Sequence, residues 1–478
     1  MKVNELLELD VTDIALGGKA LARHEGRAVF VDRGLPGDRV LARLTRVKRA
    51  WAEARLERVE TSSPLRVDAE CPHFIRGVCG GCRFQDLRYE EQLALKERQV
   101  RETLVHLGGV QEPLVRPIRP APETRGYRNK MEFSFHPAPD GTAVLGLHER
   151  GTFEGVFALE TCILPSALTL EVVRLTQRFA RERRWRAYHP RHRGTHPEGG
   201  SGVVRYLTVR HLPHTGQCGV HLVAAAEDVP GLAEWAQEVT ALSSEVRTVT
   251  LLLNRSRSNV AFGDEERALA GDGVIVERLL GLEFEATAST FLQTNSRQAE
   301  ALYATAIEAA ALQPHEAVLD LYCGTGTLTL LMARVAGSAV GVESVGEAIE
   351  RARRNAVRNG VGNAHFLCGE ARPALRAWAR GEAPAPWPAG SAATRTAGTP
   401  GPHVVVVDPP RAGLHPRVVF RIAELAPERI VYVSCNPATL ARDLKDFAQH
   451  GWRLAEITPF DLFPHTPHIE CVARIVRG

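Results

Sequence analysis

From residue 289 onward, continuous apolar segments alternate with helical patterns, and this alternation limits the possible folds more than any other feature of the chain. The apolar segments predict strands at residues 317–321, 339–342, 404–407 and 430–433. The helical patterns cover residues 295–312, 327–335, 346–358 and 417–425. Strands that are apolar on both faces and separated by helices are typical of a doubly wound parallel sheet. We therefore predict a Rossmann-like α/β domain over residues 286–478.

The rest of the chain predicts two further domains, which agrees with a length of 478 residues. Residues 1–62 contain short alternating strands separated by glycine turns, a pattern that predicts a small OB-like β-barrel. Residues 63–285 contain a cysteine-rich segment, a helical pattern over 89–107 and many strand-like segments, which predict an α+β domain. Residues 381–402 are rich in Pro, Ala, Gly, Ser and Thr, so we expect a flexible insertion without a catalytic role.

A glycine loop follows the first strand of the α/β domain, in the segment Val318-Leu-Asp-Leu-Tyr-Cys-Gly-Thr-Gly-Thr327. Gly324 and Gly326 allow a tight turn and a close approach of the backbone to a ligand at the carboxyl end of that strand. An ordinary strand–helix turn is the alternative. Glu343 ends the next strand, where a carboxylate can bind both ribose hydroxyls, and no phosphate-binding P-loop pattern is present. These features favour a nucleoside without a pyrophosphate, and S-adenosylmethionine is the leading choice.

Two polar motifs follow the last two predicted parallel strands. Asp408-Pro-Pro-Arg-Ala-Gly413 follows the strand at 404–407, and Ser434-Cys-Asn-Pro437 follows the strand at 430–433. Active sites of open α/β sheets lie at such carboxyl ends. A lone cysteine is usually a small buried apolar residue, but this position predicts that Cys435 opens onto the cofactor crevice.

A polar loop, Phe463-Pro-His-Thr-Pro-His-Ile-Glu470, leads into the last predicted strand. His465, His468 and Glu470 are candidates for proton transfer. For each histidine alone, a hydrogen-bonded loop residue is the better interpretation.

Methylation of uracil at carbon 5 needs the groups that these motifs supply. A thiolate that adds to carbon 6 makes carbon 5 nucleophilic toward a methyl sulfonium, and a base must then remove the carbon 5 proton. Cys435, Glu470 and the loop of Gly324 provide the nucleophile, the base and the methyl-donor site. A free thiol has a pKa of about 8.5, so a cation such as Arg411 would help to form the thiolate.

Four of the nine cysteines are spaced like metal ligands. Cys71 and Cys79 are separated by seven residues, Cys79 and Cys82 by two, and Cys162 lies far downstream. Four thiolates suit a tetrahedral zinc or a four-iron cluster equally well by number. A fully ligated cluster has no open iron, so it would be structural or redox-sensing.

Charge and hydropathy bear on the partners. The net charge is only +3, but residues 174–210 contain ten arginines against two acids, with Trp185 and Tyr188 among them. Arginine with aromatic residues suits RNA contact, and a solvated surface loop is the alternative. No long apolar run or apolar signal core is present, so we expect a cytoplasmic protein that does not enter a membrane.

Taken in order, the motifs resemble the RNA 5-methyluridine (uracil-5-)methyltransferases, specifically the ribosomal branch with an N-terminal TRAM domain. The resemblance is carried by Cys-Gly-Gly-Cys with its flanking cysteines, Asp-Leu-Tyr-Cys-Gly-Thr-Gly, Asp-Pro-Pro-Arg-Ala-Gly, Ser-Cys-Asn-Pro and Phe-Pro-His-Thr-Pro-His-Ile-Glu. It covers nearly the whole chain.

The resemblance implies a class I methyltransferase domain, an RNA-binding TRAM domain and a monomer. It also implies Cys435 as nucleophile and Glu470 as base. A 4Fe–4S cluster, with zinc as the less favoured occupant, would be held by Cys71, Cys79, Cys82 and Cys162. Contacts with S-adenosylmethionine would come from Gln293, Tyr322, Gly324, Gly326, Thr327, Glu343, Glu370 and Asp408. Three features depart from the family pattern: the longer gap between Cys71 and Cys79, Glu370 in place of Asp, and the additional residues 381–402.

The resemblance favours ribosomal over transfer RNA, and the motifs themselves do not distinguish the two. An amino-group methyltransferase would share the fold but would place an aromatic residue where Arg411 stands. A non-enzymatic iron–sulfur RNA-binding protein would leave Cys435 and Glu470 without a role.

Overall fold

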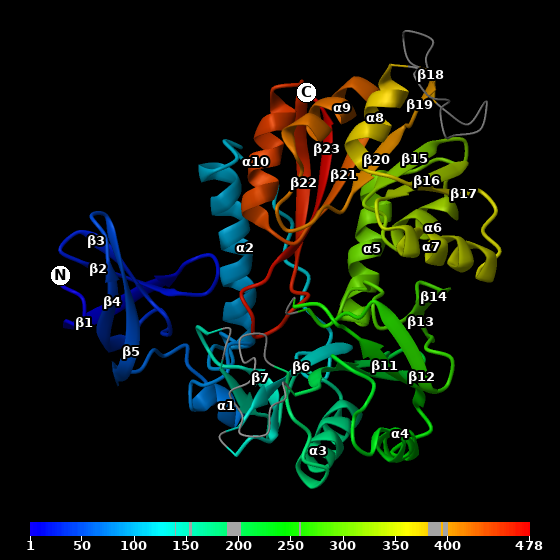
Figure 1. Cartoon of the computed structure of the whole chain (residues 1–478). Coiled ribbons are helices and arrows are strands. Elements are labelled where there is room, and N and C mark those ends of the chain that lie inside the picture. The colour runs from blue at the N-terminus through cyan, green and yellow to red at the C-terminus, as the bar shows by residue number, and fades with distance from the viewer. Residues whose placement is uncertain (139, 153–154, 189–201, 258–259, 381–392, 395–399) are drawn as a thin grey trace.

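The computed structural model describes all residues except 139, 153–154, 189–201, 258–259, 381–392 and 395–399 (Figure 1). Its described residues form a closed β-barrel, a seven-stranded central sheet and a seven-stranded C-terminal sheet, with two small two-stranded sheets. None of the described helices combines the length and apolar character needed to cross a bilayer. Most of the predicted insertion at 381–402 lies outside the described residues.

The N-terminal barrel confirms the predicted small β-barrel. Its strand order is β1-β2-β3-β5-β4, and side chains of all five strands alternate between the barrel core and the surface. The strands are β1 (Leu6–Ile14), β2 (Ala20–His24), β3 (Arg27–Val31), β4 (Arg39–Val47) and β5 (Trp51–Thr61). The sequence patterns had not predicted β2, a five-residue strand between two glycine turns.

The central sheet has the order β12-β11-β10-β9-β6-β7-β8, and α3 and α4 pack on it. Its strands are β6 (Lys130–Pro137), β7 (Ala143–His148), β8 (Val156–Ala158), β9 (Val204–His211), β10 (Cys218–Ala224), β11 (Val246–Leu253) and β12 (Glu265–Ala270). The helices are α1 (Pro72–Ile75), α3 (Ala167–Glu182) and α4 (Leu232–Ala241), and β13 (Ile275–Leu279) pairs with β14 (Leu282–Ala286).

The C-terminal sheet has the order β17-β16-β15-β20-β21-β23-β22. Its strands are β15 (Ala317–Leu321), β16 (Ser338–Glu343), β17 (Ala364–Cys368), β20 (Val404–Val407), β21 (Arg429–Ser434), β22 (Trp452–Phe460) and β23 (Glu470–Arg477). The prediction of a wholly parallel sheet is corrected at β23, which pairs antiparallel with both β21 and β22. β18 (Ala393–Thr394) and β19 (Pro400–Gly401) form a separate small pair.

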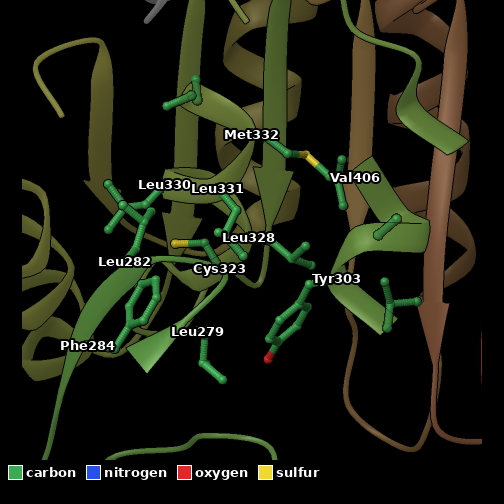
Figure 2. Packing of buried hydrophobic residues seen from close by; sticks show 14 of the residues in the cluster. Leu279, Leu282, Phe284, Tyr303, Cys323, Leu328, Leu330, Leu331, Met332 and Val406 are labelled. Carbon is green, nitrogen blue, oxygen red and sulfur yellow. The ribbon is translucent and has the colours of Figure 1, made fainter. Parts of the chain in front are cut away.

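Helices cover both faces of this sheet. They are α5 (Ser296–Ala310), α6 (Thr327–Ala333), α7 (Gly346–Arg358), α8 (Ala371–Ala379), α9 (Pro416–Leu425) and α10 (Pro437–Ala448). Figure 2 shows part of one face, where Leu328, Met332 and Val406 pack together and Tyr303 lies at the margin of the cluster. Val318, Leu330 and many other members of this cluster are fully buried.

Helix α2 (Tyr89–His106) links the three parts of the molecule. Val100 and Leu104 belong to the apolar cluster of the C-terminal sheet, and α2 packs along α10 (Figure 1). Arg98 forms a two-pronged ion pair with Asp13 of the barrel, with both N–O distances 2.7 Å. These contacts cross the predicted boundaries at residues 62 and 285, and the division of the chain at those residues stays a prediction.

Candidate active site

The register of the C-terminal sheet gathers the predicted catalytic and cofactor residues at one edge. Leu321 of β15 lies beside Val342 of β16 and Val407 of β20, so these three strands end at the same level. The glycine loop, Glu343 and Asp408 follow at that level. Because β23 runs antiparallel, it begins where β21 ends, and Ser434 lies opposite Cys471. Cys435 and Glu470 therefore meet across two neighbouring strands.

The glycine loop after β15 has a strongly curved backbone. Gly324 and Gly326 have φ angles of +55° and +82°, and Tyr322 has φ +65°, a region that non-glycine residues rarely adopt. A Cβ on Gly326 would lie 2.8 Å from the ring of Phe366, so glycine is needed there for packing. A Cβ on Gly324 would meet nothing within 4 Å. The loop therefore leaves open space above Gly324, where a ligand can approach the backbone.

Glu343 is held in place by backbone donors. Its Oε2 accepts from Gly324 N at 3.3 Å, and its Oε1 accepts from Ser344 N at 2.7 Å and Val345 N at 3.0 Å. Carboxylates bonded in this way keep a fixed orientation, which suits recognition of a diol such as ribose.

The other predicted cofactor residues include Thr327, Gln293 and Glu370. Thr327 is the first residue of α6 and is buried. Gln293 is also buried, in the segment before α5, and its carbonyl accepts from Asn129 Nδ2 at 2.9 Å. Glu370 is exposed at the start of α8, one strand beyond Glu343. The structure thus places Thr327 and Glu370 at this edge of the sheet, whereas the printed contact of Gln293 is with Asn129, just before β6.

Three acids at this edge have lost much of their water. Burial raises the pKa of Asp320 and that of Asp408 to about 7, and it raises the pKa of Glu470 well above its usual value. Asp320 accepts from Thr329 Oγ1 at 2.6 Å, while its second oxygen has no partner among the described residues. An orphaned buried oxygen and mutually repelling carboxyls fit a cationic ligand. The ammonium and sulfonium groups of S-adenosylmethionine meet that requirement.

Cys435 is half-buried directly after β21. Burial, and then the charges of Glu470 and Asp408, raise the pKa of its thiol to about 11. Arg411 lowers this pKa, as predicted, but its effect is outweighed. In the protein alone the thiol is therefore protonated at neutral pH, and added positive charge beside it would favour the thiolate.

The two predicted loop histidines differ in their surroundings. His468 lines a cavity, and partial desolvation there, followed by the charge of Arg411, lowers its pKa to about 4, so it is neutral. His465 has φ +65°, and both its backbone N–H and its carbonyl are hydrogen-bonded to residues far away in the sequence. His465 thus matches the interpretation of a hydrogen-bonded loop residue.

The four predicted metal-binding cysteines line one cavity of about 650 Å³. The cavity lies between the central sheet and the loop of residues 461–469, which contributes Thr466 and His468. The four cysteines are free thiols: Cys71, Cys79, Cys82 and Cys162. Burial, with smaller contributions from neighbouring thiols, raises the pKa of Cys82 and that of Cys162 to about 12. Among the described residues, no group of three or more His, Cys, Asp or Glu side chains could hold a single metal ion. The four cysteines line one shared cavity, but they are not grouped as ligands around a single ion.

The arginine-rich segment is less available for RNA than the sequence indicated. Trp185 is 1% exposed and packs against Trp235 in the central core, so it cannot stack on a base. Arg178 and Arg183 pair with Glu238 and Glu234 of α4. Residues 189–201, which contain the middle of this segment, lie outside the described residues.

Sequence reasoning missed Tyr303 and Lys96. Tyr303 is 5% exposed on α5. Burial, and then the charges of Asp408 and Glu470, raise its pKa, so its hydroxyl lies near these two acids. Figure 2 shows that hydroxyl turned away from Leu328 and Val406. At helical spacing Tyr303 reads as an ordinary core residue. Lys96 of α2 donates to Asp461 Oδ1 at 2.6 Å. No local pattern distinguishes it from the other charged residues of that helix.

Known proteins match the chain over its whole length. A family model described as tRNA (uracil-5-)-methyltransferase matches residues 232–477, and a TRAM domain model matches residues 1–56. An uncharacterised RNA methyltransferase of Nitratidesulfovibrio vulgaris is 41% identical over 470 residues, covering 98% of this chain and 95% of its own. A second, from Chlorobaculum tepidum, is 38% identical over 492 residues, covering 99% and 97%.

One solved structure also matches nearly the entire chain. The crystal structure of Pyrococcus abyssi tRNA (uracil-54, C5)-methyltransferase in complex with S-adenosyl-L-homocysteine has a TM-score of 0.74 and 28% identity. The match covers 98% of this chain and 100% of that one.

Proposed function

Because this chain belongs to the RNA uracil-5-methyltransferase family and is an S-adenosylmethionine-dependent enzyme, we propose that it forms 5-methyluridine in large-subunit ribosomal RNA. Cys435 is the nucleophile and Glu470 the base in this proposal. The observation that carries it is the meeting of these two side chains at the carboxyl end of β21, beside the glycine loop.

The bound cofactor supplies an electrophilic methyl group, and the residues at the sheet edge orient it. Glu343 is held where it would bind the ribose, and by the family resemblance Gln293, Tyr322 and Thr327 would contact the nucleoside. The unpaired oxygen of Asp320 and the carboxyl of Asp408 provide negative charge for the cationic part. Positive charge brought between these acids offsets their repulsion, and together with Arg411 it lowers the pKa of Cys435 toward neutrality.

Cys435 then acts as a thiolate. Its sulfur bonds to carbon 6 of the uracil, and the electrons of the 5,6 double bond move toward the carbonyl at carbon 4. Carbon 5 takes the methyl group, and the sulfonium becomes a neutral thioether. Glu470 removes the proton from carbon 5, the double bond re-forms, and the carbon–sulfur bond breaks to release Cys435. The raised pKa of Glu470 makes its carboxylate a stronger base than a solvated one.

We also propose that the four cysteines hold a 4Fe–4S cluster rather than zinc. Zinc requires all four sulfurs about 2.3 Å from one centre. A four-iron cluster places each thiolate on a different iron, so the sulfurs lie farther apart around a larger group. The family resemblance favours the cluster, and the four cysteines that line one cavity supply the four thiolates it needs.

The cluster proposal predicts about four irons and four acid-labile sulfides per chain when the protein is purified without oxygen. Cys82→Ser should lose most of this iron, whereas Cys218→Ser in the central core should retain it. A full complement of zinc with no iron in the unaltered protein would contradict the cluster.

The choice of ribosomal RNA is supported by the TRAM domain resemblance, and two comparisons favour transfer RNA. The matching family model is described as tRNA (uracil-5-)-methyltransferase. The Pyrococcus abyssi relative is described as a transfer RNA enzyme and matches 98% of this chain. We therefore treat transfer RNA as the second candidate substrate.

Substrate choice is tested by incubating the protein with S-adenosylmethionine and either unmodified large-subunit ribosomal RNA or unmodified transfer RNA. Nucleosides from each RNA are then identified by mass spectrometry. We expect 5-methyluridine in the ribosomal RNA. If it forms in transfer RNA alone, the ribosomal assignment is wrong, and if a methylated amino group forms instead, the uridine reaction is wrong.

A further inference from the structure

The loop that leads into Glu470 contains a strained residue, and the backbone N–H and carbonyl of this residue are hydrogen-bonded to groups outside the C-terminal sheet. The loop spans residues 461–469 between β22 and β23, and His465 lies five residues before Glu470. At φ +65° His465 occupies the left-handed region, which is unfavourable for a non-glycine residue. Such a conformation persists only where surrounding contacts hold it.

One set of those contacts comes from the side chain of Gln92 on α2. Its Oε1 accepts from His465 N at 3.0 Å, and its Nε2 lies 3.3 Å from His465 Nδ1. The same Nε2 donates to the carbonyls of Phe84 and Leu87, both at 2.8 Å. Gln92 is fully buried. This single amide therefore ties the catalytic loop to the segment that follows Cys82.

A second set comes directly from that segment. The backbone N–H groups of Arg83 and Phe84 both donate to the carbonyl of His465, at 2.8 and 3.0 Å. These two donors come immediately after Cys82, so whatever holds Cys82 also fixes their direction. Tyr127, which packs in the cluster of Cys71 and Cys82, donates its hydroxyl to the carbonyl of Pro464 at 3.1 Å.

The start of the loop is held by a buried ion pair. Lys96, one turn beyond Gln92 on α2, donates to Asp461 Oδ1 at 2.6 Å, and both side chains are inaccessible to solvent. Lys96 Nζ also donates to the carbonyl of Phe463 at 3.3 Å. The loop is thus held at residues 461, 463, 464 and 465, all by groups outside its own sheet.

From these contacts we propose that Gln92 is a positioning residue for the catalytic base, and that it couples the cysteine site to Glu470 through His465. The proposal rests on the proposed role of Glu470. Order at Cys82 sets the direction of the backbone N–H groups of Arg83 and Phe84. These two donors and Gln92 hold His465 in the left-handed conformation. That conformation directs the chain toward Glu470. Loss of order at the cysteine site would release the loop and misplace the base.

The test compares two glutamines on the same helix. Gln92→Met removes the amide that holds His465 but keeps the approximate volume. Gln99→Met is the matched control, because Gln99 is also buried on α2 and donates to the carbonyl of Ile14 in the barrel at 2.8 Å, away from the catalytic loop. Both variants should lose stability, and Gln92→Met should lose more. It removes the partner of the His465 N–H and of the Phe84 and Leu87 carbonyls, whereas Gln99→Met removes the partner of the Ile14 carbonyl.

We expect Gln92→Met to lower kcat by about 10- to 100-fold, because a misplacement of about 1 Å can have an effect of this size. KM for S-adenosylmethionine and the Kd for RNA should not change, and Gln99→Met should keep its kcat. In native-state hydrogen exchange, the amide of His465 should exchange faster in Gln92→Met only. Equal kcat values for the two variants, or an unchanged exchange rate at His465, would overturn the proposal.

The coupling to the cysteine site is tested by hydrogen exchange without reference to activity. Cys82→Ala should accelerate exchange at the amides of His465 and Thr466, whereas Cys218→Ala should not. If Cys82→Ala leaves this exchange unchanged, the coupling is wrong even where Gln92 positions the loop. If Glu470 is not the base, Glu470→Gln should retain activity while the exchange results remain as expected. Failure of the proposed base is thereby distinguished from failure of the coupling.

Discussion

Cys435→Ala should abolish methylation, with a loss of at least about 10⁴-fold in kcat, because removal of an enzymatic nucleophile has effects of this order. Without the sulfur, carbon 6 of the uracil receives no electrons and carbon 5 stays unreactive toward the methyl donor. Alanine removes one partly buried thiol at the end of β21, so the fold should be unaffected. The measurement is the transfer of labelled methyl groups to RNA, with binding of S-adenosylmethionine and RNA measured in parallel.

The matched control is Cys368→Ala. Cys368 is exposed at the end of β17 in the same sheet, so it tests for general sensitivity to the loss of a thiol. This variant should retain methylation. Full activity in Cys435→Ala would instead support amino-group methylation, in which Cys435 has no role.

Glu470→Gln should slow product release by about 10²–10⁴-fold, the usual contribution of a general base. Glutamine has nearly the same shape but cannot accept the carbon 5 proton, so the reaction should stop after methyl transfer with the RNA still bonded to Cys435. Labelled RNA should then comigrate with the protein under denaturing conditions.

The burial of Glu470 adds a pH dependence. Desolvation and the charge of Asp408 raise its pKa well above the usual value, so the ionised base is less abundant at low pH than a solvated glutamate would be. In the unaltered enzyme the covalent complex should therefore persist longer as pH falls. Glu470→Gln should lose this dependence, and rapid turnover without a trapped complex would contradict the role of Glu470.

Local patterns in the sequence predicted the parts of the site that lie directly after strands. Helix α7 has the predicted bounds of 346–358, and β15 and β20 coincide with the predicted strands. The two strands are short and uniformly buried, so their apolar runs were unambiguous. Because parallel strands end at one edge, the positions of Asp408 and Cys435 followed from the pattern alone.

The patterns failed where tertiary contacts decide the structure. The segment of β22 has mixed burial, and β23 runs antiparallel because the chain reverses after β22 and inserts β23 between β21 and β22. The ion pair between Lys96 and Asp461 joins residues 365 positions apart in the sequence. Neither helical periodicity nor local charge distinguishes Lys96 from the exposed charged residues of α2. The same holds for Gln92, whose function depends on a loop that lies far along the chain.

Helix α2 shows the same limit at the level of domains. Its apolar positions predicted an amphipathic helix, and the structure confirms that helix. The sequence could not show which surface it covers. It packs on α10 and β22, so a segment placed in the predicted central domain contributes to the core of the C-terminal domain.

The central claim is covalent catalysis on uracil carbon 5, and one measurement tests it most directly. RNA that contains 5-fluorouridine at the target position has no carbon 5 proton for Glu470 to remove, so the enzyme should remain bonded to the methylated base. Protease and nuclease digestion followed by mass spectrometry should find one peptide that carries methylated 5-fluorouridine, attached at Cys435. Attachment at another residue, or methylation without any adduct, would contradict the account.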